Sequence, residues 1–291
     1  MKLEMHKQAL VLPDIVLTQK LERLLKQYIP GVKITQTTSG KENHYEIVIK
    51  EGSPSFNINN DRAIYTTPKI SEEDIMALSS RITEYLWSKK GIYSVHSSAI
   101  NINDKTILMP GRPGAGKTTL MLALVKRFPE AKIISGDRTL IDNKIIVEGT
   151  KTLNFIASSL EEEFPYYSNL LKEYKKKNRV TFPAEKSPFT YHFEPTDISA
   201  IIYPQKHPGK FIGKEIQGVS NLIRFSNQAY YFLDEFPRLL IGALIPITTP
   251  LHDEEKQKTL YEMKRLTDTT PSYFTSGTLT DIVNFVESEI L

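Results

Sequence analysis

The chain has 291 residues, of which 40% are apolar and 10% aromatic, as in an ordinary globular protein. Its formal net charge of +3 is too small to indicate a nucleic-acid partner or a membrane surface. The sequence contains no cysteine, which excludes a disulfide framework, a thiol nucleophile and a cysteine-based zinc site. Residues 1–7 lack the apolar core of a signal peptide, and no apolar run is long enough to span a membrane. We therefore expect a soluble, cytoplasmic protein.

Residues 1–70 are predicted to form a small N-terminal α+β subdomain, followed by a nucleotide-binding domain over residues 71–291. Leucines at positions 17, 21, 24 and 25 have helical spacing. Tyr45, Ile47 and Ile49 alternate with polar residues, as in a strand with one face in water. We find no motif with a recognisable chemistry in this subdomain, and we interpret it as a packing or lid element.

A helix is predicted to start at Ser71, which is a good N-terminal cap and precedes acidic residues that the helix dipole favours. Gly91 is expected to end this helix. Residues 93–100 are predicted to form a strand, and residues 101–105 a turn before a second strand at residues 107–109. This hairpin leads into the most informative stretch of the sequence.

Residues 111–118 match the phosphate-binding loop pattern: glycine, any four residues, glycine, lysine, then serine or threonine. Glycine lets the backbone pass close to phosphates with its N–H groups turned inward, and the helix that follows directs the positive end of its dipole toward the same anion. Lys117 is placed to reach the outer phosphates, and the Thr118 hydroxyl to bind Mg²⁺. The residues expected to bind the nucleotide are Gly111, Arg112, Pro113, Gly114, Ala115, Gly116, Lys117, Thr118 and Thr119.

Two acidic positions are candidates to complete a nucleotide site. Asp137 follows a predicted strand at residues 131–135, and ligands gather at the carboxyl ends of strands in open α/β sheets. Residues 139–148 are then predicted to form a second hairpin. The alternative is the apolar run at residues 230–233, after which Glu235 would polarise a water for hydrolysis. We prefer Asp137, because the second match is generic and its segment suits a helix or loop as well as a strand.

Other charged residues have more than one interpretation. Residues 161–163 are acidic and residues 172–179 are basic, and both are interpreted as solvated faces of helices. Arg179 and Lys186 are the best candidates for cations that reach the phosphates from outside the loop. His96 could contact a phosphate or transfer a proton, or it could be a half-buried strand histidine bonded to a backbone carbonyl.

The order of motifs from His96-Ser-Ser-Ala-Ile, through the loop, to Gly136-Asp137-Arg138 resembles the catalytic core of HPr kinase/phosphorylase. It is more similar still to the HPr-kinase-like proteins of peptide-modification clusters, which include kinases of lasso peptide precursors. This group is similar in its core to ATP-dependent phosphoenolpyruvate carboxykinase. The resemblance covers residues 84–150 well, extends loosely to the C-terminal strand and helix, and hardly includes residues 1–70.

The resemblance implies an α/β fold with a P-loop-containing, HPr-kinase/carboxykinase-like core that uses ATP and Mg²⁺. It implies that Lys117 and Thr118 handle the phosphates and the metal, and that His96 faces the reacting phosphate. It also implies that Asp137 binds the metal or activates the acceptor hydroxyl. HPr kinases carry two adjacent acids here, whereas this chain has one acid followed by Arg138, a candidate to stabilise the transferring charge. The HPr-binding signature and the carboxykinase substrate motifs are absent, and because HPr kinases are oligomers, this chain is a candidate homo-oligomer.

The sequence therefore favours an ATP-dependent kinase that transfers the γ-phosphate to a hydroxyl, either on a serine of a protein or peptide or on a small molecule. The alternatives are an NTP hydrolase that acts as a switch, with Glu235 in the hydrolytic role, and a non-catalytic nucleotide-binding regulator. A regulatory GTPase is not expected, because the guanine-reading motif Asn-Lys-x-Asp is absent. Neither a nucleic acid nor a membrane is an expected partner.

Overall fold

The computed structural model describes residues 1–13, 15–35, 45–53, 55–58, 62–67, 69–170, 172–183, 187–229, 239–240, 245–246 and 253–291. It is a mixed α/β structure with several sheets, which confirms the expected α/β class. The chain divides into two compact units, residues 1–93 with 230–259, and residues 94–229 with 260–291. The expected domain boundary at residue 70 stays a prediction. Within the described ranges, no helix is long and apolar enough to cross a membrane.

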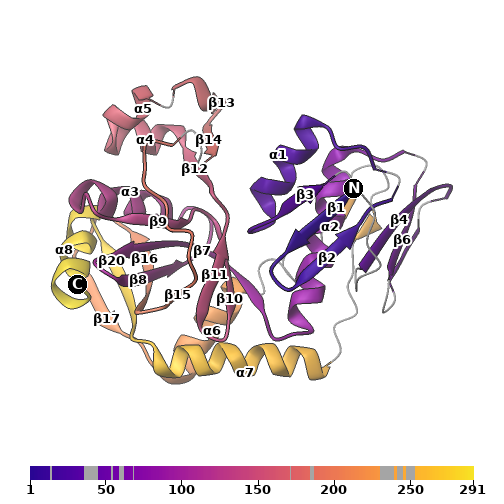
Figure 1. The fold of residues 1–291 in the computed structure, drawn as a ribbon. Helices are drawn as coiled ribbons and strands as arrows, with labels where there is room; N and C mark the ends of the chain where they lie inside the picture. The colour runs from indigo at the N-terminus through magenta and orange to yellow at the C-terminus, as the bar shows by residue number, and fades with distance from the viewer. Residues whose placement is uncertain are drawn as a thin grey trace. The chain divides into compact units, whose positions relative to one another are not determined.

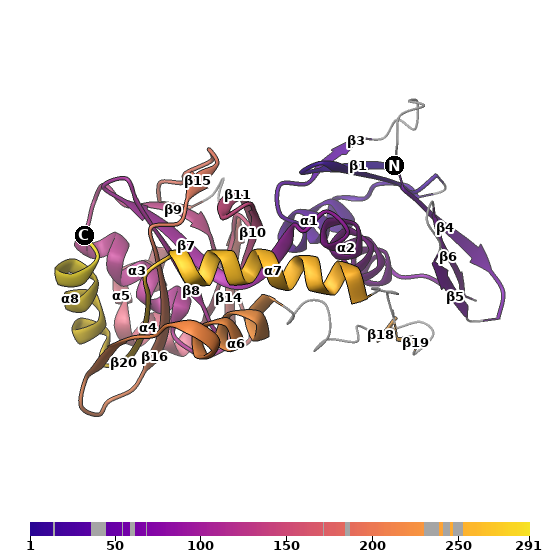
Figure 2. The same ribbon diagram turned by 90° about the horizontal axis from the view of Figure 1, so that it is seen from below.

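The first unit contains a six-stranded mixed sheet and two helices (Figure 1). In order across the sheet, its strands are β3 (Lys33–Thr35), β1 (Lys2–Met5), β2 (Gln8–Val11), β4 (Tyr45–Glu51), β6 (Arg62–Thr67) and β5 (Ser55–Ile58). A short pair, β18 (Leu239–Leu240) and β19 (Ile245–Pro246), also belongs to this unit. Helices α1 (Gln19–Tyr28) and α2 (Glu72–Ser88) lie side by side against this six-stranded sheet (Figure 2). The expected cap of α2 is confirmed, because Ser71 and Asp74 form a reciprocal capping box.

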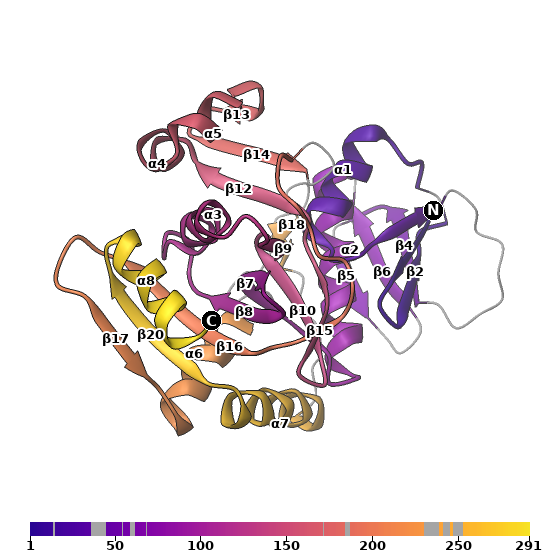
Figure 3. The ribbon, with the colours of Figure 1, turned by 60° about the vertical axis from the view of Figure 1, so that its left-hand side comes forward.

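The second unit contains a nine-stranded sheet (Figure 3). In order across it, the strands are β15 (Thr196–Asp197), β11 (Ile145–Gly149), β10 (Arg138–Asp142), β7 (Tyr93–Ile102), β8 (Lys105–Pro110), β16 (Ala200–Lys206), β20 (Ser272–Gly277) and β17 (Ile212–Glu215), with β9 (Lys132–Ser135) paired to β7. Strands β8, β16 and β20 run parallel, whereas β7 runs antiparallel to β8. The carboxyl ends of the three parallel strands therefore meet at one edge of the sheet.

Both hairpins expected from the sequence are confirmed. Strands β7 and β8 are joined by a turn in which Asn103 and Asp104 have φ of +48° and +62°. Strands β10 and β11 are joined by a turn in which Asn143 and Lys144 have φ of +51° and +69°. Asparagine and aspartate tolerate this left-handed conformation better than most residues, so the turns follow from local sequence.

Helices α3 (Lys117–Arg127) and α8 (Leu279–Glu289) pack against each other on the nine-stranded sheet. The core between them is apolar and fully buried, and it includes Ile100, Ile107, Met109, Leu120, Leu124, Ile282 and Val286. The other long helices are α6 (Gly218–Ala229) and α7 (Asp253–Thr269).

A smaller three-stranded sheet adds a wall beside α3 (Figure 3). It consists of β12 (Thr152–Ile156), β14 (Arg179–Pro183) and β13 (Lys175–Lys176), and the chain between β12 and β13 forms α4 (Ala157–Glu163), α5 (Pro165–Leu170) and the 3₁₀ turn η1 (Lys172–Tyr174). Leu153, Phe155, Leu160 and Phe164 belong to the same buried core as α3. Burial of these side chains holds β12 and α4 against the start of α3.

Candidate functional site

The loop of residues 111–116 connects the end of β8 to the start of α3, at the edge of the sheet where the parallel strands end. Gly114 and Gly116 have φ of +85° and +93°, a conformation that glycine adopts without steric cost. Gly116 is the N-cap of α3, and no side chain caps the helix there. Backbone N–H donors and the positive end of the helix dipole therefore face any anion bound at this loop.

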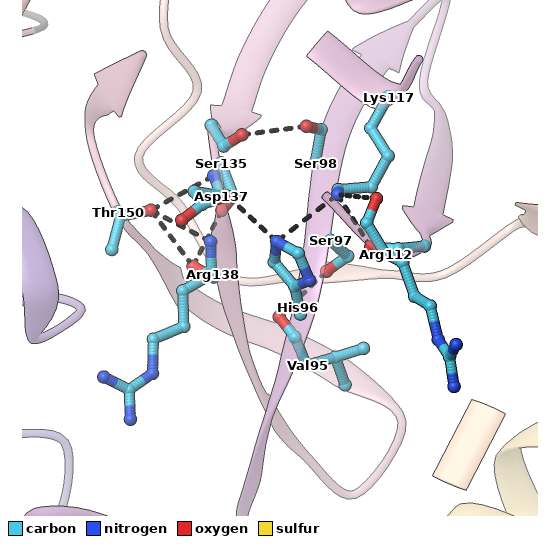
Figure 4. A network of polar contacts seen from close by, with 12 residues as sticks. Val95, His96, Ser97, Ser98, Arg112, Lys117, Ser135, Asp137, Arg138 and Thr150 are labelled. Atoms are coloured by element: carbon cyan, nitrogen blue, oxygen red, sulfur yellow. Dashed lines mark hydrogen bonds and ion pairs between the residues drawn. The ribbon is translucent and has the colours of Figure 1, made fainter. Parts of the chain in front are cut away.

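His96, Lys117 and Asp137 come together beside the loop, from β7, the start of α3 and the connection between β9 and β10 (Figure 4). The Nε2 atom of His96 lies 3.1 Å from Oδ1 of Asp137 and 3.3 Å from Nζ of Lys117. Lys117 Nζ also donates to the carbonyl oxygens of Gly111 at 2.7 Å and Arg112 at 3.2 Å. His96 and Lys117 are buried, whereas 42% of the Asp137 side chain is exposed. The cluster is thus open to solvent at the carboxylate.

The surroundings of the cluster shift all three pKa values. Burial lowers the pKa of Lys117 to about 8, although Asp137 opposes the change. Burial also lowers the pKa of His96, with Lys117 adding to the effect and Asp137 opposing it. Burial alone would raise the pKa of Asp137, but the hydrogen bond from His96 and the charges of Lys117 and Arg179 outweigh it, and the pKa lies below its ordinary value. At neutral pH the cluster holds a carboxylate, a neutral imidazole and an ammonium group.

The position of the imidazole proton follows from these charges. Nε2 of a neutral histidine either donates or accepts a hydrogen bond, so it cannot donate to Asp137 and accept from Lys117 at once. An ionised carboxylate accepts hydrogen bonds only, so the 3.1 Å contact requires the proton on Nε2. Lys117 is then held by the loop carbonyl oxygens. His96 therefore orients the Asp137 carboxylate.

Backbone contacts fix Asp137 at the edge of the sheet. Its carbonyl oxygen accepts from the Ser97 N–H at 3.1 Å, and its own N–H donates to Thr150 Oγ1 at 3.3 Å. A side chain at Gly136 does not fit, because its Cβ would lie 2.3 Å from the carbonyl oxygen of Thr152. The glycine before Asp137 is therefore required for the chain to pass close to β12.

Arg138 is buried, and its guanidinium group points away from the cluster (Figure 4). Its Nε donates to the Ser94 hydroxyl at 3.0 Å. The structure thus brings His96, Lys117 and Asp137 together but does not bring the Arg138 guanidinium to them. The expected role of Arg138 in stabilising transferring charge stays a prediction.

A cavity of about 140 Å³ lies between the loop and the wall formed by β12 and α4. The loop side is formed by Gly114, Gly116, Lys117, Thr118 and Thr119. The opposite side is formed mainly by Asn154, Phe155, Ile156, Leu160 and Phe164. The lining thus combines polar groups from the loop with apolar side chains from the wall. The cavity therefore places apolar side chains opposite the groups that would bind phosphates.

The sequence interpretation missed this wall, and it missed Lys206, which also lines the cavity. Residues 154–164 contain no motif, and their apolar side chains resemble those of any core segment. Lys206 is the last residue of β16, the strand next to β8. A lysine at the end of a strand indicates a phosphate-binding residue only when the order of strands in the sheet is known, because that order decides whether the lysine lies near the loop.

The other expected residues lie in different surroundings. Arg112 and Pro113 are exposed, and Ala115 is half-buried. Arg179 is an exposed residue of β14 whose charge contributes to the lowered pKa of Asp137. Glu235 and Lys186 lie outside the described residues.

The residues at the loop have the donor types that the expected Mg²⁺ site needs. Among the residues that the structure describes, no three histidine, cysteine, aspartate or glutamate side chains form a group that could hold a metal. Mg²⁺ is normally held by one or two carboxylates together with substrate phosphates and waters, and does not need an all-protein cage. Asp137 has a half-exposed, ionised carboxylate, and Thr118 is a hydroxyl residue that lines the cavity, so the two residues have the donor types of that kind of site.

Comparison with known proteins assigns no family to this chain. No protein-family model matches the sequence, and no curated protein matches it.

Proposed function

We propose that this chain is an ATP-dependent kinase with an HPr-kinase-like core that transfers the γ-phosphoryl group to a hydroxyl. The observation that carries the proposal is the contact of Lys117 and Asp137 with the same Nε2 atom of His96, directly beside the glycine loop. A cation for the phosphates and an ionised carboxylate for the incoming hydroxyl are thereby held within a few ångströms of each other. Phosphoryl transfer needs this pairing of charge stabilisation with an oriented acceptor.

Phosphate binding rests on the loop, the start of α3 and Lys117. The N–H groups of the first helical turn and the helix dipole favour a bound anion. An ammonium group has three donors, so Lys117 can bind a phosphate oxygen while keeping its two bonds to loop carbonyl oxygens. Thr118 and Asp137 are the residues that would hold Mg²⁺, which when bound neutralises charge on the phosphates.

The chemical step is an in-line attack of the acceptor oxygen on the γ-phosphorus. A new P–O bond forms to the acceptor, the bond to the β–γ bridging oxygen breaks, and ADP leaves with the bond electrons. The acceptor proton passes to the Asp137 carboxylate, which His96 orients through its Nε2–H. The products are a phosphomonoester and ADP.

The reaction is tested with Asp137→Asn and Lys117→Ala, using Asp104→Asn in the exposed β7–β8 turn as the matched control. Turnover of Mg-ATP is measured with and without serine-containing peptides and small hydroxyl compounds. Wild type should turn over slowly alone and faster with one acceptor. Asp137→Asn should lower the stimulated rate by at least about 100-fold while still binding ATP, and Lys117→Ala should abolish turnover.

Two results would contradict the proposal. Normal stimulated turnover in both site variants would remove the assigned roles. Brisk turnover without an acceptor that survives Asp137→Asn would favour the hydrolase alternative, in which Glu235 polarises the attacking water. The control Asp104→Asn should behave as wild type in every assay.

A further inference from the structure

A second lysine lies at the loop, on a strand that is distant in sequence. Lys206 ends β16, which runs parallel to β8, so its Cα lies at the edge of the sheet where the loop begins. The Lys206 N–H donates to the carbonyl oxygen of Ala115 at 3.4 Å. A Cβ at Gly116 would lie only 3.1 Å from the Cβ of Lys206. The Lys206 side chain therefore starts in contact with the loop, and it lines the same cavity as Lys117 and Thr118.

The ammonium group of Lys206 already has an anionic partner. It forms an ion pair with Glu163, the last residue of α4. The side chains are 37% and 24% exposed, so water reaches both of them. Because α4 belongs to the opposite wall of the cavity, a carboxylate from that wall neutralises a cation that lines the cavity.

The two lysines of the cavity are held differently. Lys117 is buried, and its hydrogen bonds go to the uncharged carbonyl oxygens of Gly111 and Arg112. The positive charge of Lys206 is instead neutralised by the Glu163 carboxylate, with which a more highly charged anion can compete. A nucleoside triphosphate carries several negative charges, whereas Glu163 carries one, and half-exposed ion pairs contribute little stability. We therefore expect a phosphate group to compete with the Glu163 carboxylate for Lys206.

We propose that Lys206 is a phosphate-binding residue of the nucleotide site and that Glu163 is an internal competitor, which a bound nucleoside triphosphate displaces. This inference rests on the proposed function, because it requires that the loop bind nucleotide. It adds a second cation to the site and makes nucleotide binding break the ion pair that joins α4 to the end of β16.

If Glu163 competes with the nucleotide for Lys206, substitutions of the two residues should change the affinity for Mg-ATP in opposite directions. Lys206→Met removes a charge-assisted hydrogen bond to phosphate and should weaken Mg-ATP binding by at least about tenfold. Glu163→Gln removes the competing charge and should strengthen binding by up to about fivefold. The double variant should bind like Lys206→Met alone, because Glu163 has no effect once its target is gone. A purely structural ion pair would instead weaken binding in both single variants.

The experiment is a calorimetric titration with Mg-ATP at neutral pH. The matched controls come from a second ion pair of the same wall, Lys175 with Glu161 on α4, which does not line the cavity. Glu161→Gln removes a negative charge from α4, as Glu163→Gln does, and Lys175→Met removes a positive charge from β13 of the same wall. Both should leave the dissociation constant within about twofold of wild type.

The outcomes separate this inference from the proposed function. If wild-type protein does not bind Mg-ATP, both fail. If wild type binds, Lys117→Ala does not, and Lys206→Met and Glu163→Gln shift affinity in the same direction or leave it unchanged, only the role of Lys206 and Glu163 is overturned. If the Lys175 and Glu161 controls shift affinity as strongly as their counterparts, the effect is one of overall charge and the inference is also overturned.

Discussion

The buried ammonium group of Lys117 predicts an unusual dependence of stability on pH. Its pKa falls from 10.5 to about 8 on folding because burial disfavours the charge. At about 1.36 kcal/mol per pH unit, this difference corresponds to about 3 kcal/mol of folding free energy. Below pH 8 the Lys117 side chain is protonated in the folded and in the unfolded state, so the full free-energy cost of burying its charge is present. Between pH 8 and pH 10.5 the unfolded state binds more protons, so stability rises with pH until the cost is lost.

The substitution Lys117→Met removes the titrating group and keeps much of its volume. Near pH 7 it should remove the cost of about 3 kcal/mol but lose two hydrogen bonds worth about 1 kcal/mol each. The variant should then be more stable than wild type by about 1 kcal/mol. Near pH 10.5 only the loss remains, so the variant should be less stable by about 2 kcal/mol.

The assay is urea unfolding of both proteins near pH 7 and near pH 10.5, followed by circular dichroism. The difference between variant and wild type cancels the titration of groups that both proteins share. Lys126→Met, at an exposed position of α3, is the control, and its effect should change by less than about 0.5 kcal/mol between the two pH values. A Lys117→Met effect that is equal at both pH values would refute the argument that burial depresses the lysine pKa.

Two further predictions concern glycines. Gly116→Ala should weaken Mg-ATP binding by at least about tenfold in a calorimetric titration, because alanine resists a φ of +93° and its Cβ would lie 3.1 Å from Lys206. The position of Gly114 has a φ of +85°, but among the described residues no atom other than those of its chain neighbours lies within 4 Å of an added Cβ. Gly114→Ala should therefore weaken Mg-ATP binding less than Gly116→Ala, and equal losses would contradict the close approach at Gly116. Gly136→Ala should lower the free energy of unfolding by at least about 2 kcal/mol in urea, because its Cβ would lie 2.3 Å from the carbonyl oxygen of Thr152. Unchanged stability would show that β12 can move away at little cost.

Elements with short-range signals could be predicted from the sequence. The cap of α2 depends on Ser71 and Asp74, which are three residues apart and bond to each other. The hairpins depend on turns whose residues tolerate left-handed backbone, such as Asn103 and Asn143. The helix that follows the glycine loop depends on a contiguous motif. In each case the stabilising contacts lie within a few residues, so the sequence contains the whole cause.

The wall of the cavity could not be predicted in this way. Strand β12 pairs with β14 through contacts such as Asn154 with Thr181, which are 27 residues apart. Its stability comes from burying Phe155 and Leu160 in a core shared with α3. An apolar residue indicates burial but does not say which distant surface covers it, so residues 151–190 look irregular in the sequence.

The sequence by itself determined which chemical groups are available at the site: in chain order, a histidine, a glycine loop, a lysine and an acidic residue. Only the tertiary structure decided which of these side chains meet. Asp137 and Arg138 are neighbours in the chain, yet Asp137 contacts His96 while the Arg138 guanidinium bonds to Ser94. Asp137 is the last residue of the bend between β9 and β10, whereas Arg138 is the first residue of β10, so the pairing of β10 directs the Arg138 side chain but not that of Asp137. The pairing of β9 and β10 with their neighbours sets where this bend lies, and the pairing of β16 with β8 brings Lys206 to the loop.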